Sequence, residues 1–164
     1  MPFPICGKCA ASGVLCDECV KKEREGKLSE LDVLLSTLLA SHGVNGYDEA
    51  REIGDKLVIF ASGEETSKII GTKGNTAADI SRKLGRRIIV IDKSWDKDLL
   101  IKSLARPMRL MAKNRIYKQG GGEVLKLIFD KPLDEGIAKL VKELVGGVEI
   151  EHQKIDYPRK EHTR

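Results

Sequence analysis

Four cysteines lie near the start of the chain, in two pairs with the same internal spacing. The pairs are Cys6-Gly-Lys-Cys9 and Cys16-Asp-Glu-Cys19, and residues 10–15 separate them. Two-residue spacing lets both sulfurs of a pair turn toward one ion, so the pairs together offer four soft ligands to a tetrahedral metal such as zinc. The segment has few apolar residues, which favours a metal as the group that makes it fold. We therefore predict that Cys6, Cys9, Cys16 and Cys19 bind Zn²⁺.

Other cysteine chemistry is left open by the spacing alone. A redox C-x-x-C pair normally opens a helix after a strand, and an iron site would use the same four thiolates. Disulfides are disfavoured in a cytoplasmic chain. We expect a cytoplasmic protein with no membrane partner, because no apolar run approaches bilayer length and the start MPFPICGKC lacks a signal-peptide core. The short gap between the pairs favours a compact zinc knuckle, which could contact RNA or protein or only cap the N-terminus.

The second motif is Gly71-Thr72-Lys73-Gly74, which lies between two helix-like segments. Glycines lack a Cβ, so a polyanion backbone can come close to the loop. The loop N–H groups and the start of the following helix supply donors and a partial positive charge. Lys73 adds a full charge at the same place. The motif therefore predicts a phosphate clamp, although a plain turn would use the same glycines.

The charges of the chain are segregated. Residues 28–67 carry two basic and eight acidic side chains, whereas residues 68–93 carry seven basic and two acidic ones, and residues 101–131 eight and two. The whole chain has 33% charged residues and a net charge of +4, which is typical of a globular protein. The two basic blocks indicate a polyanion, nucleic acid rather than membrane, although a solvated surface would look the same.

The elements that must position these motifs follow from periodicity and end signals. Residues 29–43 predict a helix capped by Ser29, with an apolar stripe too broad for one seam, so it is sandwiched in a core or shared with another surface. Residues 55–62 and 86–92 predict strands, and residues 64–71 and 75–85 predict helices on either side of the glycine loop. Farther on, we expect a helix over 96–108, a hairpin over 109–130, a helix over 133–147 and a last strand from 148.

The segment IIGTKGNTAADISRKLG, followed by a strand, resembles the core of a K-homology (KH) domain, and the preceding helix makes it similar to the type II arrangement. The resemblance implies single-stranded RNA binding by the glycine loop, which holds about four nucleotides in such domains. It also implies an apolar groove beside the loop. Ala77 stands where the family usually has a larger aliphatic residue, and isoleucines at helical spacing could equally be core. The RNA-binding residues that it implies are Lys68, Ile70, Gly71, Thr72, Lys73, Gly74, Asn75, Arg82, Arg86 and Arg87.

Residues 94–152 repeat part of this order without a second G-x-x-G and resemble a degenerate KH module, with acidic residues where a phosphate would sit. We thus expect an α+β protein with a zinc knuckle and charged connector (1–27), a KH domain (28–93), a degenerate KH-like module (94–152) and a flexible tail (153–164). Tandem KH modules resemble small archaeal NusA-like transcription elongation and termination factors. The cysteine-rich start is an addition to that family pattern.

Three classes of function can be compared on these residues. An RNA-binding protein uses both the loop and the basic blocks. An enzyme lacks support, because the three histidines have no evident nucleophile or carboxylate partner, and no nucleotide-binding P-loop or small-molecule site is indicated. An adaptor would dock through the zinc segment and the acidic helix to RNA polymerase or the ribosome, and it could also bind RNA.

Overall fold

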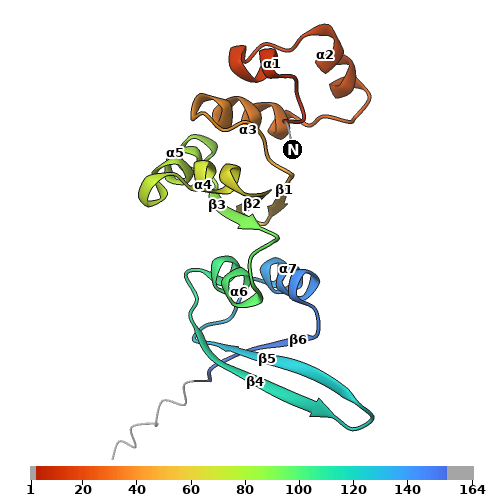
Figure 1. Cartoon of the computed structure of the whole chain (residues 1–164), viewed down its shortest axis with the longest axis vertical. Helices are drawn as coiled ribbons and strands as arrows, with labels where there is room; N and C mark the ends of the chain where they lie inside the picture. The colour runs from red at the N-terminus through yellow and green to blue at the C-terminus, as the bar shows by residue number, and fades with distance from the viewer. Residues whose placement is uncertain (1–2, 155–164) are drawn as a thin grey trace, which may run out of the picture. The chain divides into compact units, whose positions relative to one another are not determined.

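The computed structural model describes residues 3–154 and divides the chain into two compact units, Met1–Leu104 and Ala105–Arg164. Each unit contains a three-stranded sheet with one antiparallel and one parallel strand pair (Figure 1). The expected α+β class is therefore confirmed. Nearly all of the tail predicted to be flexible lies outside the described residues.

Three helices open the first unit: α1 (Gly7–Ser12), α2 (Asp17–Arg24) and α3 (Glu30–Ser41). The charged run expected as a connector begins within α2, which continues through Arg24, and the chain then turns at Gly26, which has φ +72°. Lysine, arginine and glutamate are good helix formers, so a charged run after a helix start extends that helix.

Helix α3 begins as predicted. The Asp32 backbone N–H donates to Ser29 Oγ, and the Ser29 N–H donates to the Asp32 carboxylate, each at 3.1 Å. This reciprocal pair satisfies donors that the first turn leaves free. The helix ends before His42 and Gly43, and the His42 ring nitrogen Nε2 lies 2.8 Å from Asp79 Oδ2. His42 thus joins the end of α3 to Asp79, which is a packing role rather than a ligand role.

The first sheet comprises β1 (Glu49–Ile53), β2 (Lys56–Ala61) and β3 (Arg87–Asp92), and α4 (Glu64–Ile70) and α5 (Asn75–Leu84) connect β2 to β3. Strand β2 lies in the middle, antiparallel to β1 and parallel to β3. Strand β1 was not expected from the sequence. The resulting order is helix, two strands, two helices and strand, and it places the glycine loop between α4 and α5.

The core of the first unit lies between the sheet and its helices. Its buried apolar side chains come from α3, β2, α4, α5 and β3 and from the loop before β1. They are Leu35, Leu39, Val44, Tyr47, Leu57, Ile59, Ala61, Ile69, Ile80 and Val90. Helix α3 contributes to this core with Leu35 and Leu39, while Val33 and Ala40 pack on a separate cluster around Cys9 and Cys19. The broad stripe of α3 is therefore shared between two surfaces.

The second unit follows α6 (Lys97–Ala105) and comprises β4 (Leu110–Lys118), β5 (Gly122–Phe129), α7 (Glu135–Val145) and β6 (Val148–His152). Strand β5 pairs antiparallel with β4 and parallel with β6, which repeats the strand order of the first unit with one helix fewer between the last two strands. The predicted hairpin and final helix are confirmed. Within residues 3–154, no helix has the length and apolar character needed to cross a membrane.

Candidate metal centre and phosphate-binding loop

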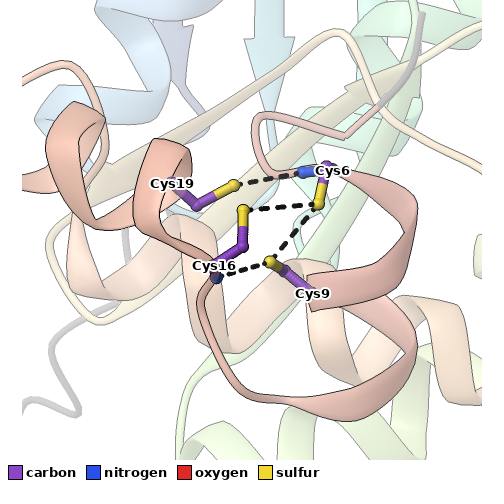
Figure 2. A group of neighbouring side chains, drawn as sticks. All are labelled: Cys6, Cys9, Cys16 and Cys19. Atoms are coloured by element: carbon purple, nitrogen blue, oxygen red, sulfur yellow. Dashed lines mark hydrogen bonds between the residues drawn. The ribbon is translucent and has the colours of Figure 1, made fainter.

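The four cysteines occupy equivalent places at the starts of two short helices. Cys6 and Cys16 are the N-cap residues of α1 and α2, and Cys9 and Cys19 lie one turn later (Figure 2). All four sulfurs lie within 4.8 Å of one another, with Cys6 Sγ 3.3 Å from Cys9 Sγ and 3.9 Å from Cys16 Sγ. Zinc–sulfur bonds of about 2.3 Å in a tetrahedron place the sulfurs roughly 3.8 Å apart. The predicted ligands thus form one cluster suited to a metal ion.

Backbone donors cross between the two pairs. The Cys16 N–H donates to Cys9 Sγ at 3.0 Å, and the Cys6 N–H donates to Cys19 Sγ at 3.5 Å (Figure 2). Each first cysteine therefore supports the second sulfur of the other pair. Such bonds favour the thiolate, which is the form that binds a metal. The reciprocal pattern also fixes the two helix starts relative to each other.

The thiol pKa values show how closely the sulfurs compete for protons. Hydrogen bonds from the backbone and thiol of Cys9 lower the pKa of Cys6 to about 7. The Cys16 N–H lowers the pKa of Cys9, but burial and the thiols of Cys6, Cys16 and Cys19 outweigh it and raise that pKa to about 12. Four neighbouring thiolates need a cation to offset their charge, so metal binding must release protons from this cluster.

A small apolar core supports the cysteine cluster. Cys9 and Cys19 are each 1% exposed and pack with Ile5, Ala10 and Leu28, whereas Cys6 and Cys16 are exposed. Two partly buried residues of α3, Val33 and Ala40, close this core from the other side. The N-terminal segment is therefore attached to the first unit through α3, and the exposed edge of the cluster faces solvent.

The glycine loop spans residues 71–74, between the end of α4 and the start of α5, with a short 3₁₀ turn over Thr72–Gly74. Gly71 has φ +74° and ψ 174°, a conformation that is essentially confined to glycine. A Cβ at this position would lie 2.7 Å from Thr76 Cβ and 2.8 Å from the Thr76 backbone nitrogen. Gly71 is thus needed for the close packing of the loop on α5.

Gly74 has a different role. Its φ of +77° and ψ of 13° are left-handed helical, and a Cβ there would meet nothing within 4 Å. Lys73 is also left-handed, with φ +54°, which is uncommon for a residue with a side chain. Thr72, Lys73 and Asn75 are exposed. The loop therefore presents open backbone at Gly74, next to a lysine that forms no ion pair within residues 3–154.

Most of the other predicted basic residues are paired with acids. Lys68 Nζ lies 3.2 Å from Glu65, Arg82 lies 3.1 Å from Asp79, and Arg86 lies 2.8 Å from Glu52. Lys83 and then His42 hold the pKa of Asp79 below its ordinary value, so this carboxylate stays ionised between them. Arg87 is half-buried in β3. The positive charge near the loop is accordingly concentrated on Lys73.

The apolar residues beside the loop divide into core and surface. Ile80 is fully buried in the core, so it offers no surface for a base. Ile70 and Leu84 are partly buried and pack against the same core, and Ala77 is half-exposed. Of the isoleucines in the predicted groove, Ile70 keeps accessible surface on the helix side.

Asp92 fixes the start of α4, the helix that leads into the loop, and the sequence reasoning missed it. Its carboxylate accepts hydrogen bonds from the Gly63 N–H at 3.0 Å, Thr66 Oγ at 3.3 Å, and the N–H and Oγ of Ser94 at 2.9 and 2.6 Å. Burial raises the pKa of Asp92, but these hydrogen bonds outweigh it and hold the pKa below its ordinary value. The carboxylate thereby fastens the first turn of α4 to the end of β3. The sequence signal that could have revealed it is an aspartate at the end of an apolar strand, two residues before a serine.

In the second unit, the corresponding helix start is closed. The Asp134 side chain accepts hydrogen bonds from the Gly136 N–H at 2.9 Å and the Ile137 N–H at 3.4 Å, at the start of α7. These are the donors that an anion would use, and the carboxylate repels a phosphate. Asp134 thus lies at the helix start where a phosphate would otherwise bind, as the sequence predicted for the acidic residues of this loop.

We compared the chain with known proteins. No family model matches. No curated protein matches either. Among solved structures, the crystal structure of APE1850 is similar over 72% of this chain and 94% of its own, with 22% sequence identity and a TM-score of 0.41. Nothing about function follows from a likeness of this size, so the function has to be inferred from the residues of the chain itself.

Proposed function

We propose that this chain binds single-stranded RNA through residues 71–74, in the manner of a type II KH domain. The observation that carries the proposal is the open backbone at Gly74 beside Lys73, which has no acidic partner within residues 3–154, at the start of the ten-residue helix α5. An approach to Gly74 that no side chain obstructs, a helix N-terminus and an unpaired lysine suit the phosphates of a nucleic acid strand. The KH-like order of helix, two strands, two helices and strand supports the same proposal.

The rim residues would contribute less than the loop. Lys68, Arg82 and Arg86 must exchange an existing carboxylate partner for a phosphate, so each adds little net binding energy. Thr72 and Asn75 are exposed and can donate hydrogen bonds from the loop, and Ile70 can contact a base. The two aromatic residues of the KH-like region 28–93, Tyr47 and Phe60, are both buried, so base stacking is not available there.

We further propose that the cysteine cluster holds Zn²⁺ in a structural role. Four thiolates leave no open coordination position, which distinguishes a structural zinc site from a catalytic one. On this proposal the chain is a binding protein rather than an enzyme. Contrary to the sequence expectation, His42 has a carboxylate partner, because its Nε2 lies 2.8 Å from Asp79 Oδ2. A reducing cytoplasmic location would keep the thiols available for the metal.

The biological role that fits best is a NusA-like factor in transcription elongation or termination. The alternative is an adaptor that docks on the ribosome or its RNA through the N-terminal segment. Co-purification after nuclease treatment separates these roles, because a polymerase-bound factor and a ribosome-bound adaptor would bring different proteins with them. Recovery of neither assembly would contradict both roles and leave the RNA clamp to be tested separately.

The clamp is tested by changing Thr72 and Lys73 to aspartate. Aspartate tolerates left-handed backbone, so the fold should persist, while two carboxylates at the loop repel phosphate. We expect loss of single-stranded RNA binding in a fluorescence anisotropy titration. Gln153→Asp with Lys154→Asp is the matched control, because it changes the net charge equally at exposed positions of the other unit. Equal affinities of the two double variants would show that the loop does not hold RNA.

A further inference from the structure

The β4–β5 hairpin carries the most exposed large hydrophobic side chain among residues 3–154. Tyr117 is 75% exposed near the end of β4, and every residue from there to Glu123 is exposed. An aromatic ring that gains nothing from the core, held on a well-paired strand, is available to a ligand.

The register of the hairpin sets basic residues in line with this ring. Lys113, Arg115 and Tyr117 are opposite Leu127, Leu125 and Glu123, so the three side chains project from one face of the sheet at alternate positions. Neighbours in this row are about 7 Å apart along the strand, close to the separation of successive phosphates in an extended nucleic acid strand. The row therefore presents two positive charges and then a ring, at a spacing that a single nucleic acid strand can follow.

The surrounding charge favours a polyanion. Residues 101–131 carry eight basic and two acidic side chains. Arg115 lies 3.3 Å from Glu123, and Lys118 lies 3.9 Å from Glu149, but the side chains of both pairs are largely exposed. Such surface pairs contribute little stability and are readily exchanged for a phosphate. Strand β4 has a neighbour on one side only within the described residues, and its lysines and arginine disfavour pairing with another protein strand.

The hairpin tip leaves the backbone accessible as well. Gly120 and Gly121 have φ of +102° and +89°, and a Cβ on either would meet no atom within 4 Å. A ligand backbone can therefore approach the turn closely. Met111, at the irregular start of β4, is 54% exposed and is the other large apolar side chain that this strand offers. The exposed apolar area of the hairpin is thus small and interrupted, unlike a protein-docking surface.

We propose that the β4–β5 hairpin is a second RNA-contact surface, on which one base stacks on Tyr117 and phosphates contact Lys113 and Arg115 on the same face. The choice of RNA as the partner rests on the function proposed for the glycine loop. The surface supplies what the loop lacks, which is an exposed aromatic ring. It recognises single strands by stacking and charge, so it lengthens the bound segment without adding much sequence preference.

The test compares short and long RNA on the full chain. We expect Tyr117→Ala to weaken binding of an RNA of about 20 nucleotides by roughly fivefold to 150-fold, the range for loss of one base stack, and to leave a 5-nucleotide RNA bound as before. Tyr117→Phe keeps the ring and should bind like the unchanged chain. Long RNA carrying 4-thiouridine should crosslink to a peptide from residues 110–129. Because Tyr117 is exposed, neither variant should alter the thermal transition.

The outcomes separate the two surfaces. If Tyr117→Ala binds long RNA normally while the aspartate variant of Thr72 and Lys73 does not, the hairpin proposal is wrong and the clamp stands. The reverse result leaves the hairpin as the RNA surface and removes the clamp. If the unchanged chain binds neither RNA, both proposals fail. If Tyr117→Ala instead loses a protein partner that survives nuclease, with RNA affinity unchanged, the hairpin is a protein surface and our inference is overturned.

Discussion

The two glycines of the loop should respond differently to the same substitution, although the motif treats them alike. Gly71→Ala forces a Cβ into a conformation that costs about 1–3 kcal/mol in a residue other than glycine. The new atom would also overlap Thr76 Cβ and nitrogen, at 2.7 and 2.8 Å. A backbone nitrogen cannot rotate away, and overpacking of this kind costs about 1–3 kcal/mol more. We therefore expect Gly71→Ala to destabilise the first unit by about 2–6 kcal/mol.

Gly74→Ala meets no neighbour, so it should cost only the left-handed backbone term of about 1–2 kcal/mol. Its Cβ would instead project into the open space where we place the RNA backbone. Gly74→Asn should be milder in stability, because asparagine tolerates left-handed backbone. The two alanine variants should therefore have different effects. Gly71→Ala should lower stability strongly, whereas Gly74→Ala should lower RNA affinity with a smaller loss of stability.

Urea unfolding followed by the fluorescence of Trp95 measures the difference. Trp95 is the only tryptophan and belongs to the first unit. With a slope of about 1–3 kcal/mol per molar urea, the two alanine midpoints should differ by roughly 1 M. RNA affinity is measured below both transitions, so that unfolding does not contribute. Equal midpoints for the two alanine variants would refute the separate roles of the glycines.

Two further predictions concern the four-cysteine metal site and the carboxylate of Asp92. Elemental analysis should find about one zinc per chain, and the double variant Cys16→Ser with Cys19→Ser should lose it. This variant should also unfold at a lower temperature, because the N-terminal segment that packs on α3 is no longer held by the metal. Finding iron, or no metal after anaerobic purification, would contradict the zinc site. Asp92→Asn should destabilise the fold by about 2–3 kcal/mol at neutral pH, because charge-assisted hydrogen bonds are lost. The folded pKa of Asp92 lies below its unfolded value, so its contribution is present above the unfolded pKa and fades as pH falls through the folded one. In acid, the free energies of unfolding of the unchanged chain and of Asp92→Asn, measured by urea titration, should become equal. A difference that stays constant from neutral to acid pH would argue against an ionised Asp92.

Local signals were sufficient where chemistry and structure are both local. The capping box at Ser29 and Asp32, the glycines around the loop and the spacing of the cysteines each depend on residues a few positions apart. Strand β1 is the instructive failure. Its sequence EAREI is mostly charged, but Gly54 and Asp55 between Ile53 and Lys56 form a two-residue hairpin connection, with Gly54 at φ +61°. A glycine-aspartate turn of this kind was a readable signal for a second strand.

Long-range pairing could not be read from the sequence. Arg86 and Glu52 meet at 2.8 Å because β1 and the turn before β3 come together in the fold. The basic block of residues 68–93 therefore predicts more free charge than it delivers. Arg86 and Lys93 pair with acids of the distant strand β1, whereas Lys68, Arg82 and Lys83 pair with acids of their own helices. The exposure of individual side chains could not be predicted from the local sequence either. Nothing local distinguishes Tyr47, which is buried and bonded to Asp32, from Tyr117, which is exposed.

The two units share a strand order but differ at the start of the helix that precedes the last strand, which is α5 in the first unit and α7 in the second. In the first unit, Gly71 and Gly74 leave the start of α5 open, and Lys73 lies beside it. In the second unit, Asp134 already accepts the donors at the start of α7. A carboxylate that caps its own helix stabilises that helix without a ligand, but it occupies the donors to which an anion would bind. Because the second unit keeps a strongly basic hairpin with an exposed ring, any RNA contact there has to use strand side chains rather than a helix start.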